Sequence, residues 1–245
     1  MNIFQASLLG LVQGLTEFLP VSSSGHLVIV QKLLPGFTQP GVLFDVLLHL
    51  ATALAILVYF REKIMETDRK FLALIVIGSA PAFLVGFLFG DLVESLFKST
   101  LVVSIGLFIT AAMNWTTDKT WARRPVIGRI DAFFIGIAQA LAIVPGISRS
   151  GSTIFAATSL GVDRSEAATF SFILSIPAIL GANLYQLVRY GFDGGVDYGA
   201  YFVGFLVAAL FGYLAISLVI RFLGEKKFKY FAAYCFVAGV VSFLI

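Results

Sequence analysis

Residues 13–26 have the sequence Gln-Gly-Leu-Thr-Glu-Phe-Leu-Pro-Val-Ser-Ser-Ser-Gly-His, a polar stretch that apolar runs flank on both sides. It contains an acid, a histidine, three serines, two glycines and a proline. A second polar stretch, residues 139–153, has the sequence Gln-Ala-Leu-Ala-Ile-Val-Pro-Gly-Ile-Ser-Arg-Ser-Gly-Ser-Thr. Because ionisable residues inside a hydrophobic protein usually mark a site or a pathway, these two stretches are the first candidates for chemistry.

The composition is that of a membrane protein with several spanning helices. The chain has 245 residues, of which 59% are hydrophobic and 13% charged, and its mean hydropathy is +0.95. Soluble domains have about 25% charged residues. Both polar stretches lie within the apolar sequence, which excludes a soluble enzyme with a membrane anchor. The single cysteine, Cys235, excludes an intramolecular disulfide. No basic residue precedes Lys32, which argues against a cleaved signal peptide.

Apolar runs predict an all-α polytopic fold with six transmembrane helices. A spanning helix needs about 20 mostly apolar residues. The runs that qualify are 43–60, 72–90, 100–115, 168–188, 199–221 and 229–245. Segments 3–33 and 131–158 instead break at Pro and Gly, pass through serines and turn apolar again. We expect both to be re-entrant helix hairpins, since irregular backbone at membrane depth needs protein or water around it.

The chain contains an internal repeat at an offset of 126 residues. Identical residues at this offset include the pairs Gly10/Gly136, Gln13/Gln139, Ser22/Ser148, Ser24/Ser150, Gly25/Gly151, Phe44/Phe170 and Gly78/Gly204. We therefore expect one membrane domain, 1–245, made of a first repeat, 1–115, and a second, 127–245, each with one hairpin and three spans. Three spans are an odd number, so the second repeat should be inverted relative to the first, with the site near the bilayer midplane.

Basic residues predict the orientation. Three connections, 61–71, 116–130 and 222–228, lie on one side and hold most of them: Arg61, Lys63, Arg69, Lys70, Lys119, Arg123, Arg124, Arg129, Lys226 and Lys227. By the positive-inside rule this side faces the cytoplasm. Both termini and the opening of the first hairpin should then face the outside of the cell.

The second polar stretch predicts a phosphate-binding loop. Gly146 lets backbone N–H groups turn toward an anion, and Ser148, Ser150 and Thr153 add hydroxyl donors near a helix N-terminus. Arg149 adds a planar guanidinium that suits phosphate. The alternative is a helix-capping turn in which Arg149 pairs structurally with Glu17.

The first polar stretch predicts a nucleophile and a base. His26 could accept the proton of a serine hydroxyl, with Ser23 as the predicted nucleophile, and Ser22 is predicted to bind the substrate. Glu17 could orient the histidine or bind a metal, and Gln13, four residues earlier, shares its helix face. A carboxylate and an amide oxygen are ligands for Mg²⁺ or Ca²⁺. The alternatives are a serine helix cap and a structural histidine.

Asp45 and His49 are four residues apart and share one face of the first span. Their repeat mates are Ser171 and Ser175, which indicates an interior position. They form either a structural pair or part of a second layer of side chains that surrounds and orients His26.

Together the two stretches resemble a known family. The patterns Glu/Gln-x-x-x-Glu, Pro-x-Ser-Ser-x-x-His and Pro-Gly-x-Ser-Arg-Ser-x-x-Thr resemble those of the undecaprenyl-diphosphate phosphatases of the BacA type, also called bacitracin-resistance proteins. The resemblance covers essentially the whole chain. The patterns of the acid-phosphatase type of lipid phosphatase are absent from the sequence.

This resemblance implies hydrolysis of undecaprenyl diphosphate to the monophosphate, which recycles the lipid carrier for peptidoglycan, with dependence on a divalent metal. It implies that bacitracin competes for the substrate, and no nucleic acid is expected as a partner. The family's first-motif residues fall on Gln13, Glu17, Ser23 and His26, and its second-motif residues on Ser148, Arg149, Ser150 and Thr153. Many members carry Glu at the position of Gln13, so metal ligation there has one carboxylate fewer.

Two mechanisms and one other function stay open from the sequence. Ser23 attacks the terminal phosphorus with His26 as base and Arg149 stabilising the phosphoryl group, or His26 activates water directly. The other function is alternating-access transport of the lipid phosphate or of phosphate, which inverted repeats also serve. The sequence is compatible with a monomer or a homodimer.

Overall fold

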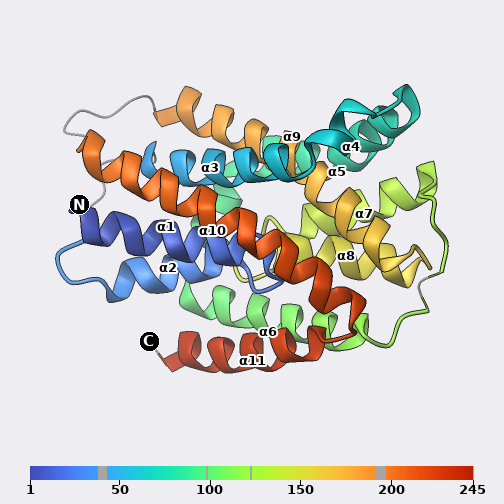
Figure 1. The fold of residues 1–245 in the computed structure, drawn as a ribbon. Helices are drawn as coiled ribbons and strands as arrows, with labels where there is room; N and C mark the ends of the chain where they lie inside the picture. Colours follow the sequence, from blue (N-terminus) through green and yellow to red (C-terminus); the bar gives the residue numbers. More distant parts are fainter. Residues whose placement is uncertain (38–42, 98, 122, 191–196, 245) are drawn as a thin grey trace.

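The computed structural model describes residues 1–37, 43–97, 99–121, 123–190 and 197–244. Regular structure in these ranges consists of eleven helices (Figure 1). They are α1 Ile3–Phe18, α2 Ser23–Leu33, α3 Leu43–Tyr59, α4 Arg61–Met65, α5 Arg69–Leu96, α6 Thr100–Thr117, α7 Arg129–Leu141, α8 Arg149–Ser159, α9 Arg164–Tyr190, α10 Tyr198–Gly224 and α11 Phe228–Leu244. The expected all-α fold is confirmed.

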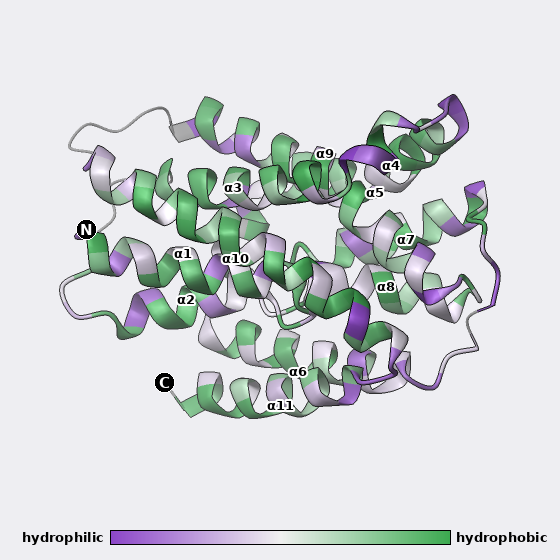
Figure 2. Ribbon diagram, in the orientation of Figure 1, coloured by the Kyte–Doolittle hydropathy of each residue, from purple (hydrophilic) through white to green (hydrophobic). Residues whose placement is uncertain are grey.

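The outer surface of the protein is apolar. Four of the helices, α5, α6, α9 and α10, are long and apolar enough to cross a membrane. The apolar helices α3 and α11 have 17 residues each, slightly fewer than the roughly 20 that a perpendicular span needs. Hydrophobic residues predominate along the helices (Figure 2), and Phe83, Leu84 and Phe87 of α5 are each more than half exposed. Such a surface suits lipid and not water.

Two helical hairpins enter the molecule from opposite ends. In Figure 1, α1 begins beside the N-terminus at the left and stops near the centre, and α2 returns to the left. In the same view α7 begins at the right, stops near the centre, and α8 returns to the right. The breaks fall in the two polar stretches singled out in the sequence.

The first break follows from proline and serine chemistry. Leu19, which precedes Pro20, has φ −59° and ψ 139°, the extended conformation that a following proline imposes. The helix restarts at Ser23 because the hydroxyl of Ser22 accepts the backbone N–H of Gly25 at 3.3 Å.

The second break uses glycine. Gly146 has φ 90°, a conformation that favours glycine, and a Cβ there would lie 2.2 Å from the carbonyl oxygen of Val103. The next helix restarts after Ser148, whose hydroxyl accepts the N–H of Gly151 at 3.1 Å.

The two breaks lie against each other. A Cβ at Gly151 would be 3.3 Å from the Cβ of Pro20, and a Cβ at Gly25 would be 3.4 Å from the Cα of Gly146. At the offset of 126, Gly25 matches Gly151 and Pro20 matches Gly146. The contact is therefore reciprocal, with each hairpin presenting the same two positions to the other.

The hairpins also pack on the opposite half of the chain through glycines. Helix α1 packs along α10, and α7 packs along α5. A Cβ at Gly10 would lie 2.4 Å from the carbonyl oxygen of Gly204, and a Cβ at Gly136 would lie 2.4 Å from that of Gly78. These four glycines are the repeat pairs noted in the sequence, and here they exchange partners. Small residues at these crossings let the helix backbones touch.

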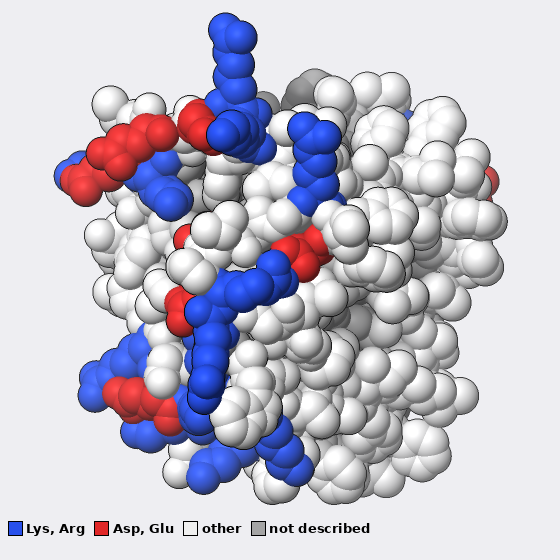
Figure 3. Space-filling view, turned by 90° about the vertical axis from the view of Figure 1, so that its right-hand side faces the viewer, with Lys and Arg blue, Asp and Glu red and all other residues white. Residues whose placement is uncertain are grey.

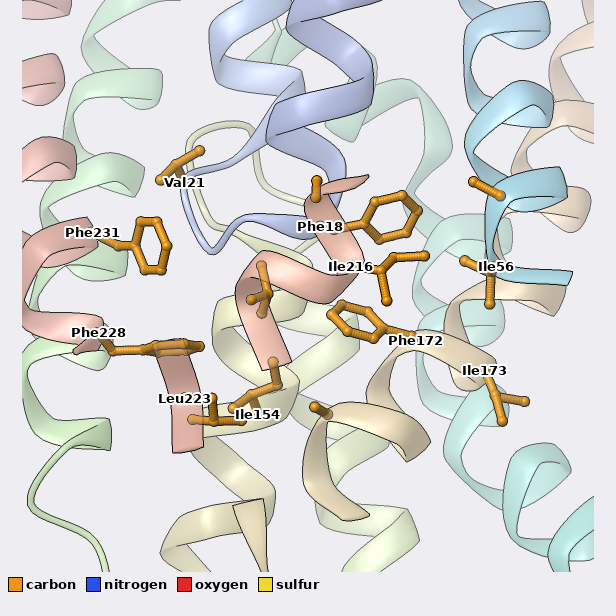
Figure 4. Packing of buried hydrophobic residues seen from close by; sticks show 14 of the residues in the cluster. Phe18, Val21, Ile56, Ile154, Phe172, Ile173, Ile216, Leu223, Phe228 and Phe231 are labelled. Carbon is orange, nitrogen blue, oxygen red and sulfur yellow. The ribbon is translucent and has the colours of Figure 1, made fainter. Parts of the chain in front are cut away.

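The largest buried apolar cluster lies beside the two breaks (Figure 4). Phe18, the last residue of α1, packs edge-on against Phe172 of α9, with ring centroids 5.5 Å apart and an interplanar angle of 89°. Val21 of the first break and Ile154 of α8 belong to the same cluster. The core therefore fixes the ends of both hairpins that carry the polar stretches.

The glycine contacts generate a stability prediction. We expect Gly10→Ala to lower the thermal unfolding midpoint in detergent, because its Cβ would meet the backbone of Gly204 and such overpacking costs about 1–3 kcal/mol. Gly136→Ala should do the same. The matched control is Gly86→Ala, whose Cβ meets nothing within 4 Å. Equal midpoints for Gly10→Ala and Gly86→Ala would contradict this account of the packing.

Candidate active site

Glu17 is the centre of the polar site. It lies in the last turn of α1 and is buried. One carboxylate oxygen, Oε1, accepts a short hydrogen bond and ion pair from Nη2 of Arg149. The other, Oε2, accepts the hydroxyl of Ser23 at 2.6 Å and Nε2 of Gln13 at 3.0 Å. The two polar stretches therefore meet at one carboxylate, and Glu17 is held by charge and by hydrogen bonds to its ionised form.

Arg149 projects from the first residue of α8 into the same site. Its side chain is 18% exposed, so part of the guanidinium stays accessible. The group carries five N–H donors, and among the described residues the only side-chain acceptor bonded to it is Glu17. The N-terminus of a helix adds positive potential at this point. The arrangement leaves donors available for an anion next to the carboxylate.

The hydroxyls of the second polar stretch hold the loop together. Ser148 and Ser150 lie 3.2 Å apart, Oγ to Oγ, and Ser150 donates to the carbonyl of Leu19 in the first break at 3.3 Å. Thr153 is fully buried, with its hydroxyl 2.5 Å from that of Ser171 in α9. Their predicted contact with substrate stays a prediction; in this structure they shape the loop that presents Arg149.

Helix α6 satisfies the broken backbone of both hairpins. The hydroxyl of Thr110 donates to the carbonyl of Gly146 and accepts the N–H of Ser148, both at 2.9 Å. The amide of Asn114 donates to the carbonyl of Pro20 at 2.6 Å. Free backbone groups in an apolar interior would each cost several kcal/mol. These two side chains therefore make the irregular segments tolerable inside the protein.

Backbone geometry at Ser22 is unusual. Its φ of 69° is one of two positive values among the described non-glycine residues, and such a conformation costs of order 1–3 kcal/mol. The Ser22 carbonyl accepts both the N–H of His26, at 3.2 Å, and its ring Nδ1, at 2.8 Å. The strain is therefore located where the backbone fixes the histidine.

The other ring nitrogen of His26 faces the last helix. Nε2 lies 2.8 Å from the hydroxyl of Tyr234 in α11, and the two rings are nearly parallel, with an interplanar angle of 11°. Because both ring nitrogens have these partners, neither is hydrogen-bonded to the hydroxyl of Ser23. The side chain directly bonded to Ser23 is Glu17.

His49 of α3 borders Glu17. Its Nε2 is 3.9 Å from Oε2 of Glu17, and its Nδ1 bonds to the backbone carbonyl of Asp45 at 2.8 Å. The carboxylate of Asp45 accepts Nε2 of Gln31 from α2 at 3.2 Å. Asp45 therefore ties α2 to α3, and His49 borders the site from the carboxylate side.

The metal-binding capacity of the site is small. Among the described residues no three His, Cys, Asp or Glu side chains form a cluster that could hold an ion. Gln13 is fully buried, and its Oε1 has no hydrogen-bond partner. The Nε2 atom of Gln13 faces Glu17, and its unpartnered Oε1 and the carboxylate are both oxygen ligands that suit a hard cation, which takes its remaining ligands from phosphate and water, as Mg²⁺ does. Glu17 and Gln13 thus fit such an ion.

Sequence reasoning missed Thr110, Asn114 and Tyr234. All three lie in apolar runs that predict spanning helices. The internal repeat carries the available signal, because the offset of 126 places them opposite Phe236, Val240 and Phe108. A polar side chain in one half opposite an apolar one in the other marks a position where the halves differ in role.

The whole chain is similar in sequence to known proteins of one family. A sequence model of the family described as "Bacitracin resistance protein BacA" matches residues 6–241. The "Undecaprenyl-diphosphatase" of Carboxydothermus hydrogenoformans is 42% identical, over 100% of this chain and 98% of the relative. That of Syntrophotalea carbinolica is 40% identical, over 100% and 99%. That of Methanobrevibacter smithii is 38% identical, over 100% and 98%.

The buried ion pair generates a second stability prediction. Arg149→Met should lower the thermal midpoint in detergent, because removing one partner leaves a buried carboxylate uncompensated, at about 3–5 kcal/mol. The double variant Arg149→Met with Glu17→Gln should recover part of the loss, since it leaves no unpaired charge. A double variant less stable than Arg149→Met alone would contradict the pairing.

Proposed function

Because this chain belongs to the bacitracin resistance protein BacA family, we propose that it hydrolyses undecaprenyl diphosphate at the site between its two hairpins. The chain is an undecaprenyl-diphosphatase. One observation supports this location for the reaction: the carboxylate of Glu17 contacts the hydroxyl of Ser23 and the guanidinium of Arg149, which come from opposite halves of the chain.

The reaction needs a nucleophile and compensation of charge. Water supplies a new oxygen to the terminal phosphorus, the bond from this phosphorus to the bridging oxygen breaks, and the bridging oxygen stays with undecaprenyl phosphate. Phosphoryl transfer depends mainly on positioning and on stabilising negative charge. Arg149, with its free donors at the N-terminus of α8, is placed to bind the non-bridging oxygens.

In the covalent route that we favour, Ser23 is the nucleophile. Its Oγ attacks the terminal phosphorus while Glu17, which already accepts its hydrogen bond at 2.6 Å, takes the proton. Undecaprenyl phosphate leaves, and water then attacks the phosphoserine, so that the bond from phosphorus to Oγ breaks and Glu17 returns the proton to Ser23. We assign His26 to this water and not to the attack by Ser23, because both ring nitrogens are bonded elsewhere, to Ser22 and Tyr234, and Nε2 would exchange the Tyr234 hydroxyl for the water to accept its proton. The competing route is direct attack by water that His26 activates.

A divalent cation completes the proposal. Glu17 and the unpartnered oxygen of Gln13 would hold it, and it would supply positive charge next to the phosphate oxygens. Mg²⁺ and Ca²⁺ both accept such oxygen ligands.

We also propose the membrane arrangement predicted from the sequence: six spans, α3, α5, α6, α9, α10 and α11, and two re-entrant hairpins in an inverted repeat. The exchanged glycine contacts support the repeat. Lys and Arg gather on one end of the molecule (Figure 3), whereas both termini lie at the other (Figure 1). The basic end would face the cytoplasm of a bacterial plasma membrane, and the termini and the opening of α1–α2 the outside.

The partners follow from the substrate. The polyprenyl diphosphate lies in the membrane with its head at Arg149 and its chain among lipids, and bacitracin would compete for this lipid. Transport of a lipid phosphate or of phosphate remains the second candidate, because hairpins that meet at mid-molecule also occur in carriers. Release of free phosphate by purified protein in detergent separates the two.

The first functional prediction concerns the nucleophile. Purified protein should release phosphate from a polyprenyl diphosphate, and Ser23→Ala should reduce kcat roughly 10²-fold or more. The control Ser24→Ala should stay near wild type, because the hydroxyl of Ser24 contacts that of Ser22 and not Glu17. A phosphoserine trapped by acid quench would support the covalent route, and full activity of Ser23→Ala would exclude it.

The second functional prediction concerns the divalent metal. Chelation by EDTA should abolish phosphate release, and Mg²⁺ or Ca²⁺ should restore it. Gln13→Glu should lower the cation concentration needed for half-maximal activity, because it adds a charged ligand beside Glu17. Activity that is unaffected by the chelator would refute the metal requirement.

A further inference from the structure

We propose that Tyr234 is a positioning residue of the active site, which acts by holding Nε2 of His26 from the opposite end of the chain. The inference rests on the proposed function, because it gives His26 a role in phosphate release. Tyr234 lies in α11, 208 positions after His26, and its hydroxyl is 2.8 Å from Nε2.

The hydrogen bonds of His26 determine where its proton resides. Nδ1 lies 2.8 Å from the carbonyl of Ser22, and a carbonyl can only accept, so Nδ1 carries a proton. In the neutral imidazole the other nitrogen is then an acceptor. The carbonyl of Ser22 thus fixes the form of His26, and the hydroxyl of Tyr234, which can donate, meets the lone pair on Nε2 and holds it in one direction.

The backbone at Ser22 supports the same reading. Its φ is 69°, whereas its repeat mate Ser148 has φ −74°. The strained copy is the one whose carbonyl meets a histidine, since Ser152 stands at the matching position in the other half. Backbone strain of this kind persists where the surrounding structure enforces it, and here Ser22 and Tyr234 hold the ring from both of its nitrogens.

Helix α2 depends more on the contact between His26 and Tyr234 than α8, its counterpart in the second repeat, depends on any single contact. Helix α8 packs against α6 and α9 as well as α7, whereas the extensive contact of α2 is with α1, with a smaller one to α6. The buried residues of α2 are Gly25, His26 and Leu27. The hydrogen bond to Tyr234 therefore connects α2, which is only partly buried and carries Ser23 and His26, to α11.

Tyr234 is also placed unusually for a surface aromatic residue. It is 48% exposed on the apolar outside, yet its hydroxyl points inward to His26. Its repeat mate is Phe108, which lacks the hydroxyl. A tyrosine hydroxyl turned away from water needs a partner, and His26 provides it. The repeat-related positions, Ser152 and Phe108, therefore have neither the imidazole nor the phenolic hydroxyl.

The test combines imidazole nitrogen NMR with kinetics on the full chain in detergent. The protein has two histidines, so labelling both rings with ¹⁵N gives few signals, and a His49→Gln sample assigns them. The variant is Tyr234→Phe, which removes only the hydroxyl. The matched control is Tyr230→Phe, one helical turn earlier on α11 and exposed.

In wild-type protein we expect His26 to carry its proton on Nδ1 and a hydrogen-bonded lone pair on Nε2. Tyr234→Phe should shift the Nε2 signal of His26 and lower kcat roughly 10- to 100-fold, with KM within about threefold of wild type. Tyr230→Phe should change neither.

Other outcomes overturn the proposal. A wild-type spectrum that shows the proton of His26 on Nε2 would overturn it. This measurement needs no variant, and it therefore still decides the question if Tyr234→Phe fails to fold. The proposal is also overturned if Tyr234→Phe leaves the Nε2 signal of His26 or kcat unchanged, or if Tyr230→Phe has the same effects as Tyr234→Phe. If wild-type protein releases no phosphate, the proposed function fails instead, while the spectra still decide whether Tyr234 holds His26.

Discussion

The ion pair between Glu17 and Arg149 is the interaction on which the rest of the structure depends. A buried carboxylate without a partner is costly, and the two charges come from hairpins that start at opposite ends of the molecule. Neither hairpin can bury its charge alone. The pair therefore requires that both breaks lie at the centre, where Ser23 and Gln13 share the same carboxylate.

Bringing two broken helices together places demands on their neighbours. The backbones must approach closely, which glycines permit at the crossings of α1 with α10 and of α7 with α5. The freed backbone groups must find partners, and α6 supplies them for both loops through Thr110 and Asn114. Its repeat mate α11 has Phe236 and Val240 at these positions. One helix thus supports both breaks, and the other is free to carry Tyr234.

The sequence predicted the breaks because proline, glycine and serine act locally on the backbone. It also predicted that the loops of Glu17 and Arg149 lie opposite each other, because the inverted repeat orients them, and it offered the pairing of these two residues as the alternative to anion binding. It could not predict the bond of His26 to Tyr234, because that contact depends on which face α11 turns inward, and a nearly uniform apolar run carries no such information. For the same reason the sequence left open whether Asp45 and His49 form a structural pair or support His26, whereas the structure places Nε2 of His49 3.9 Å from Oε2 of Glu17.

Helices α2 and α8, the second halves of the two hairpins, differ in how firmly they are packed, and the difference follows from their different roles. An anion site works best when its donors are fixed before the charge arrives, because no reorganisation is then needed. Helix α8, which carries Arg149, is buried and bonded through Ser148, Ser150 and Thr153. Helix α2 carries the groups that must exchange protons and is less enclosed. An arm held by few contacts keeps its geometry only if these are directional, and the two hydrogen bonds of the His26 ring meet this requirement.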